Sequence, residues 1–216
     1  MAHELTAAFD DAIAELRAAG RVQAKVVKGV DIEPMLAETS EPFSRDGWLF
    51  ELKLDGYRAI AGKDGERVTL HYRRGREQSA AFPEIADALR ALPIDACVLD
   101  GEICVLDERG RPSFQRLQKR ALRMGPRELP AAMKEFPAHL LVFDVLAAHG
   151  VDLRPLPLTE RKRLLSLLLP RELQGRIRVV DALAHEGESL FEAARNEGLE
   201  GVVGKRADSP YRAGRS

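Results

Sequence analysis

The strongest constraint on this chain is an apolar run that ends beside a lysine and then turns. Residues 48–50 (WLF) are apolar, Lys53 follows shortly after, and Asp55-Gly56 comes next. Asp-Gly predicts a sharp turn because glycine adopts positive φ without strain. The pattern predicts a strand that delivers an amine to the mouth of a sheet. Such an amine can be a nucleophile if it is kept unprotonated, although a bare lysine before Asp-Gly is more often a solvated residue of a hairpin.

Three further clusters carry charged residues at the ends of predicted strands. Residues 98–103 (VLDGEI) indicate an apolar strand that breaks at Asp-Gly, with Glu102 just beyond. Residues 140–146 (LLVFDVL) are long enough for a buried strand and contain one aspartate. Residues 199–206 (LEGVVGKR) enclose a short strand between Glu200 and two cations. Each cluster alone fits a turn or a solvated strand end, but four in this order are hard to ascribe to chance.

In order and content, the clusters resemble the motifs of covalent nucleotidyltransferases, the superfamily of ATP-dependent DNA ligases, RNA ligases and mRNA capping enzymes. KLDG at 53–56 resembles the motif that carries the nucleotide-accepting lysine. RRG at 73–75 resembles the next motif, with Tyr72 in place of the usual serine. DGE at 100–102, FD at 143–144 and EGVVGK at 200–205 resemble the three motifs that follow. The flanks at 34–37 and 209–215 are similar to those of bacterial DNA ligases, especially the ligase modules of end-joining enzymes.

The resemblance covers roughly residues 30 to 216 and implies an architecture. It implies an α+β covalent nucleotidyltransferase (ATP-grasp-like) fold, with antiparallel sheets flanked by helices and a nucleotide cleft between them. Residues 1–30 are expected to be an N-terminal helix and connector, and residues 31–216 an adenylation domain truncated at its C-terminal end. The family pattern continues with a segment carrying two lysines and an OB-fold barrel, so we expect this chain alone to seal nicks inefficiently.

The resemblance also implies an activity for Lys53. Its amine attacks the α-phosphate of ATP, forms a covalent lysyl-AMP, and AMP then passes to a DNA 5′-phosphate for nick sealing in DNA repair. A free lysine has a pKa near ~10.4, and bringing it to about 7 requires roughly 4 kcal/mol. We expect burial and cations to supply this. The cations available are Arg58, Lys205, Arg206 and a bound magnesium ion.

Several residues take roles by the same resemblance. Magnesium (or manganese) is expected on Glu200 first and on Glu102 second, with a bond from Glu102 to the ribose hydroxyl as the alternative. Phe143 resembles the aromatic that stacks on adenine, although a plain core phenylalanine fits its strand about as well. Arg58 and Arg73 resemble arginines that contact ribose and phosphate. The expected nucleotide-binding residues are Glu51, Leu52, Lys53, Arg58, Arg73, Glu102, Phe143 and Lys205.

The expected partners are ATP, nicked duplex DNA, a C-terminal OB-fold domain and other end-joining repair proteins, in the bacterial cytosol or nucleoid. No apolar stretch approaches a membrane span. A P-loop is excluded because position 199, where its first glycine belongs, is Leu199, and Arg206 replaces its Ser or Thr. Alternatives remain: an RNA ligase, a capping guanylyltransferase, or a non-catalytic module gripping phosphates with basic clusters at 73–76 and 116–123.

The remaining pattern predicts the secondary structure. Apolar residues recur at helical spacing from residue 5 to residue 16 and predict a helix, which Gly20 is placed to end. A polar connector is expected to follow it. Strand–Asp-Gly–strand occurs twice without a helix between, which favours antiparallel pairing. Further elements are predicted as a hairpin of 58–62 with 68–72, a helix from Pro83, helices capped by Ser113 and Thr159, and a helix over 187–196. Cys97 and Cys104 are expected to be reduced core residues.

Overall fold

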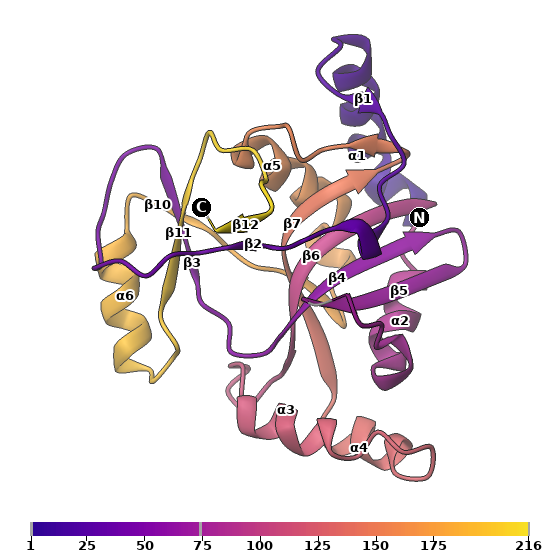
Figure 1. Ribbon diagram of the computed structural model, residues 1–216, viewed down its shortest axis with the longest axis vertical. Helices are drawn as coiled ribbons and strands as arrows, with labels where there is room; N and C mark the ends of the chain where they lie inside the picture. The colour runs from indigo at the N-terminus through magenta and orange to yellow at the C-terminus, as the bar shows by residue number, and fades with distance from the viewer. Residues whose placement is uncertain (1, 74, 216) are drawn as a thin grey trace.

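The structure, a computed structural model, describes residues 2–73 and 75–215. Figure 1 shows a large sheet through the middle of the molecule and a small sheet to one side of it. The large sheet has seven strands, and all its pairings are antiparallel except that of β9 with β7. Its strands run in the order β1 (Gln23–Ala24), β8 (Val151–Asp152), β7 (Ala138–Ala148), β6 (Ala96–Val105), β4 (Tyr57–Asp64) and β5 (Arg67–Tyr72), with β9 (Ile177–Val179) beside β7.

The small sheet is antiparallel and holds two of the predicted motif strands. It consists of β10 (Leu183–Ala184), β3 (Trp48–Leu52) and β11 (Val202–Arg206), with β3 in the middle. Helix α6 (Gly187–Asn196) packs against β3 and β11. A separate pair, β2 (Met35–Leu36) and β12 (Gly214–Arg215), runs parallel.

The helices cover one face of the large sheet. Helices α1 (Ala2–Ala18), α2 (Pro83–Arg90) and α5 (Leu158–Leu168) join the sheet in one buried core, to which α1 contributes Phe9 and Ile13. Helices α3 (Phe114–Ala121) and α4 (Leu129–Glu135) lie at one end of the molecule (Figure 1). The 3₁₀ turns are Gly29–Asp31, Ser79–Ala81 and Arg171–Leu173.

The opposite face of the large sheet is polar. Successive side chains of a strand point to opposite faces, so in β6 Leu99 enters the helix-covered core while Asp100 turns away from it. A smaller apolar cluster, which includes Ile60, Val98 and Leu146, covers part of this second face. The charged motif residues of β4 and β6 therefore share a face that the helices leave uncovered.

Bulges on β7 adjust this face. Asp100 of β6 pairs with Asp144, but the next residue, Gly101, pairs with Val142, so Phe143 is the extra residue of a bulge. Bulges re-aim side chains and occur next to active sites. Here the bulge lets Phe143 and Asp144 both avoid the core, which receives Val142 and Val145 on either side.

Two predictions about Asp-Gly were wrong. Residues 100–101 do not break a strand, because β6 continues through them and Gly101 serves a close approach: a Cβ there would lie 2.7 Å from the carbonyl oxygen of Leu141. The turn at 55–56 does not join a hairpin either. It leads from β3 in the small sheet to β4 in the large one, so the two strands do not pair.

The other secondary-structure predictions were mostly confirmed. The hairpin, the helix from Pro83 and the helix over 187–196 are present, and Gly20, with φ of 65°, follows α1. The predicted cap at Thr159 was wrong, because α5 begins at Leu158 after Pro157, and Ser113 precedes α3 without a side-chain capping bond. Both cysteines are buried and free. Within the described residues, no helix combines the length and apolarity needed to cross a membrane.

Candidate active site

Lys53 begins the segment that carries the chain from the small sheet to the large one. β3 ends at Leu52, and the N–H of Lys53 donates a 2.8 Å hydrogen bond to the carbonyl oxygen of Gly201, just before β11. The ammonium group of Lys53 pairs with the carboxylate of Glu200. Both residues adjoin strands that pair with each other, so the sheet itself joins side chains that are 147 residues apart in sequence.

The surroundings of Lys53 differ from those expected from the sequence. Its side chain is 49 % exposed rather than buried, and its charged contact is a carboxylate rather than a cation. The predicted cations are engaged elsewhere: Lys205 with Glu51, Arg58 with Asp100 and Arg206 with Asp208. The ammonium group of Lys53 is therefore held by Glu200, and this pair must open before Lys53 can contact another group.

Glu51, on the central strand β3, holds two lysines. Its side chain is 3 % exposed; one oxygen lies 2.6 Å from Nζ of Lys205 and the other 2.5 Å from Nζ of Lys162. Lys205 comes from β11, as the motif predicts, whereas Lys162 comes from α5 and was not predicted. Burial, together with the nearby positive charge of Lys205, lowers the pKa of Lys162 against the opposing effect of Glu51.

Phe143 lies at the site rather than in the core. It is half-buried and belongs to neither buried apolar cluster. The guanidinium carbon of Arg58 lies 4.4 Å from the centre of its ring and Nζ of Lys205 4.5 Å from the same point. Cations at this distance are attracted to the face of an aromatic ring. The alternative of a plain core phenylalanine is therefore not what the structure shows, while its stacking on adenine stays a prediction.

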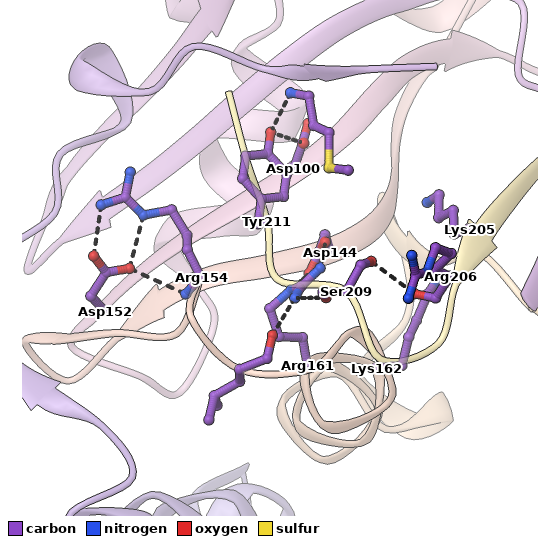
Figure 2. A network of polar contacts seen from close by, with 12 residues as sticks. Asp100, Asp144, Asp152, Arg154, Arg161, Lys162, Lys205, Arg206, Ser209 and Tyr211 are labelled. Carbon is purple, nitrogen blue, oxygen red and sulfur yellow. Dashed lines mark hydrogen bonds and ion pairs between the residues drawn. The ribbon is translucent and has the colours of Figure 1, made fainter. Parts of the chain in front are cut away.

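Arg58 is fixed on the uncovered face of the large sheet. Its Nε and Nη2 donate hydrogen bonds of 2.6 and 2.7 Å to the two carboxylate oxygens of Asp100. Tyr211 donates its hydroxyl proton to the same carboxylate at 2.6 Å and accepts a bond from the N–H of Met35 (Figure 2). Burial and the Asp100 carboxylate raise the pKa of Tyr211. Arg58 thus stands beside Phe143 with its guanidinium already bound.

Glu102 lies on the same face of β6 and has an unusual charge state. Burial raises its pKa from 4.5 to about 8, with further contributions from Asp100 and Asp55, against the opposing effects of Arg58 and Lys53. At pH 7 most of this carboxyl group is therefore protonated. Glu102 makes no side-chain hydrogen bond or ion pair with other described residues, so it is free to bond a ligand.

A second buried arginine pair lies behind the site. Arg161 of α5 donates hydrogen bonds of 2.8 and 2.9 Å to the two oxygens of Asp144, and its Nη1 reaches the carbonyl oxygens of Leu156 and Ser209 (Figure 2). The sequence allowed Asp144 an orienting role but offered no indication of Arg161. Arg161 and Lys162 are neighbours in a charged stretch of an amphipathic helix, where most cations are solvated, so only the tertiary structure distinguishes them.

Some predicted residues stand apart from this group. Arg73 lies exposed in the turn after β5 and contacts none of the described residues through a hydrogen bond or ion pair. Arg74, the next motif residue, lies outside the described residues. Leu52 pairs through its backbone with Val202 at the end of β3. No group of three or more His, Cys, Asp or Glu side chains suited to a metal was found within residues 2–73 and 75–215.

Comparisons with known proteins agree with the motifs. The sequence matches the family described as ATP dependent DNA ligase domain over residues 32–216. The multifunctional non-homologous end joining protein LigD of Pseudomonas aeruginosa is 38 % identical over 185 residues, which are 86 % of this chain and 21 % of that protein. DNA ligase C1 of Mycolicibacterium smegmatis is 34 % identical over 85 % of this chain and 54 % of that protein.

Solved structures share the fold. The ligase domain of LigD from M. tuberculosis matches with a TM-score of 0.73 and 32 % identity, over 88 % of this chain and 59 % of that one. A mycobacterial DNA ligase D complexed with ATP matches with a TM-score of 0.70 and 33 % identity, over 88 % of this chain and 58 % of that one. The two-sheet α+β fold is thus that of ligase nucleotidyltransferase domains, as expected.

The chain belongs to the family of ATP-dependent DNA ligase domains. The resemblance inferred from the motifs is confirmed at this level. The chain spans about a fifth of LigD and about half of DNA ligase C1.

Proposed function

We propose that Lys53 is the residue that accepts AMP from ATP. In this reaction the unprotonated Nζ attacks the α-phosphorus, an N–P bond forms, the bond from that phosphorus to the bridging oxygen breaks, and pyrophosphate leaves. The amine releases its proton to water. The observation that carries the proposal is the position of Lys53: it is half-exposed at the end of β3, where its ammonium group pairs with the carboxylate of Glu200.

The surrounding groups suit a nucleotide. Phosphoryl transfer depends on positioning and on neutralisation of negative charge, and Lys205 and Arg58 bring two cations to the Phe143 ring. We propose that the adenine stacks on this ring and that Lys205 contacts phosphate. A protonated Glu102 can donate a hydrogen bond to a ribose hydroxyl, which favours that role over metal binding. Arg73 remains a proposed contact of the ribose and phosphate, and Leu52 a proposed contact of the nucleotide.

Magnesium fits the donors that are present. This ion is held by one or two carboxylates together with substrate phosphates and water, and Glu200 offers a partly exposed carboxylate next to Lys53. When bound, the ion would neutralise phosphate charge. Glu102 fits less well, because a carboxyl group with a pKa of about 8 must first lose its proton.

The acceptor and the setting are also proposals. We expect AMP to pass to the 5′-phosphate at a nick in duplex DNA, with an OB-fold domain and end-joining proteins as partners, in the bacterial cytosol or nucleoid. The names of the relatives, a DNA ligase and an end-joining protein, support this acceptor over an RNA end or a cap. We assign adenylation to residues 31–216, with residues 1–30 as the N-terminal helix and connector.

Labelling with α-³²P-ATP tests the proposal. The unchanged chain, with magnesium, is expected to retain label through denaturation and to release it on addition of pyrophosphate. α-³²P-GTP is expected to give no label, which separates a ligase from a capping enzyme. Binding of nicked DNA without any covalent label would support the non-catalytic alternative and contradict the proposal.

A further inference from the structure

The pairing of Glu51 poses a question that the proposed reaction does not answer. One carboxylate, with a single negative charge, is held by two ammonium groups, one on each oxygen. A buried carboxylate needs a partner, but one lysine would suffice. The second lysine adds a positive charge next to the first, and like charges repel. Glu51 therefore has one more cationic partner than its charge requires, so one of the two lysines can leave it when a ligand binds.

The two lysines differ in where they stand. Lys205 lies on the site side of Glu51, where its Nζ also approaches the ring of Phe143 and its side chain is 23 % exposed. Lys162 lies on the helix side, 13 % exposed, with its Nζ 3.4 Å from the carbonyl oxygen of Val180. Figure 2 shows both lysines beside the Asp144–Arg161 pair. Only Lys205 is thus in a position to reach a phosphate.

We infer that Lys162 is the permanent counter-ion of Glu51, and that its presence lets Lys205 leave Glu51 to bind the phosphates of the nucleotide. This inference rests on the proposed function, because it takes the phosphate contact of Lys205 as given. It makes Lys162 a positioning residue that acts through Glu51 and Lys205 and does not touch the substrate.

The physical reason is the cost of an unpaired buried charge. If Lys205 were the only partner of Glu51, its departure would leave a buried carboxylate without a counter-ion, which is strongly unfavourable. Lys162 removes that cost, because it stays on the other oxygen throughout. The departure of Lys205 also ends the repulsion between the two ammonium groups, the same repulsion that helps burial to lower the pKa of Lys162. Nucleotide binding is therefore easier with Lys162 than without it.

The test compares variants of Lys162 in self-adenylylation as a function of ATP concentration. In Lys162→Met, Lys205 is held on Glu51 as its sole partner, so the KM for ATP is expected to rise about five- to tenfold, the scale of a partly buried ion pair. The maximal rate is expected to change less. Lys162→Arg keeps the charge and is expected to retain a KM close to that of the unchanged chain. Arg163→Met, on the same helix with its own partner Glu160, is the matched control.

A double-variant comparison separates this role from a merely structural one. In a Glu51→Gln background no carboxylate holds Lys205, so Lys162→Met is expected to have no further effect on KM. Thermal unfolding of each variant checks the fold, and Lys162→Gln replaces Lys162→Met if the latter does not fold. An unchanged KM in the neutral Lys162 variants, or an equal increase in the presence and absence of the Glu51 charge, would overturn the inference.

Equilibrium binding of ATP keeps the two proposals distinguishable. If the unchanged chain binds ATP but gains no label, the lysyl-AMP proposal fails. The ratio of ATP dissociation constants between Lys162→Met and the unchanged chain then decides the inference about Lys162. If the unchanged chain binds no ATP, both are wrong.

Discussion

The arginine pairs and the lysine pairs of this site differ in how they are held. Arg161–Asp144 and Arg58–Asp100 are bidentate, with both carboxylate oxygens bound, and each carboxylate is buried. The lysines instead make single contacts: Lys53 with half-exposed Glu200, and Lys205 with one oxygen of Glu51. Arginine offers a planar fork that matches a carboxylate, while lysine is a point charge on a flexible stem.

This difference suggests that the two kinds of ion pair have different functions. A bidentate pair has two bonds to break and a fixed geometry, so it suits a frame that keeps its shape with or without ligand. A single lysine contact can be exchanged for a phosphate oxygen at little cost. We therefore expect the arginine pairs to determine stability and the lysine pairs to determine chemistry.

The largest expected effect concerns Lys53. Lys53→Ala should lose all covalent label from α-³²P-ATP, while the free energy of unfolding changes by about 1 kcal/mol or less, because partly exposed ion pairs contribute little. Lys53→Arg should also fail, since arginine is not deprotonated in proteins. Undiminished labelling of Lys53→Ala, mapped to another peptide, would show that the acceptor lies elsewhere.

The second effect is on stability and belongs to the arginine side. Arg161→Met leaves Asp144 as a buried charge without its partner and should lower the free energy of unfolding by about 3–5 kcal/mol. Urea denaturation measures this, with Arg163→Met as the control. The Arg163 side chain is 48 % exposed in its pair with Glu160, which predicts a change within about 1 kcal/mol. Equal losses in the two variants would remove the distinction between buried and exposed arginines.

Glu200→Gln tests the metal on the lysine side. The variant keeps the shape of the side chain and removes its charge, so the magnesium concentration for half-maximal adenylylation should rise by about tenfold, or ~1.4 kcal/mol. The melting temperature should hardly move. A large fall in melting temperature with unchanged magnesium dependence would instead make Glu200 a structural residue.

Glu102 predicts an effect on stability that depends on pH. Its pKa of about 8 in the folded chain lies above 4.5, the ordinary value. The folded state therefore holds a proton that the unfolded state has lost, and stability falls as pH rises from about 4.5 to about 8. Glu102→Gln removes this loss, so the variant should gain stability relative to the unchanged chain between pH 5 and pH 8.5. If the unchanged chain instead gained stability relative to Glu102→Gln as the pH rises, the pKa of Glu102 would not be raised.

The sequence predicted the parts of the site that lie at strand ends. Lys53, Glu200 and Lys205 lie in or next to short apolar runs, and the resemblance to the nucleotidyltransferase motifs singled them out. The pairing of β3 with β11 was not predictable in the same way, because the Asp-Gly turn at 55–56 suggested a hairpin with β4. The local sequence does not distinguish a turn that joins two strands of one sheet from a turn that connects two different sheets.

Other features depend on distant contacts. The bulge that exposes Phe143 arises from the register of β7 against β6. Tyr211 binds Asp100 across 111 residues of sequence. Lys162 and Arg161 occur among other cations of α5, and only the position of the helix behind β3 and β7 gives them partners. Charged residues near strand ends could thus be predicted from the sequence, whereas the partners that hold them depend on the tertiary structure.

We expect the lysine pairs to open for nucleotide while the buried Arg161–Asp144 pair stays closed. NMR of labelled lysine and arginine side chains, recorded before and after addition of ATP and magnesium, tests it most directly. We expect large shifts for the Cε of Lys53 and Lys205, and an unchanged Nε–H resonance for Arg161. A shift of Arg161 as large as that of Lys205, or unmoved signals from both lysines with ATP bound, would contradict it.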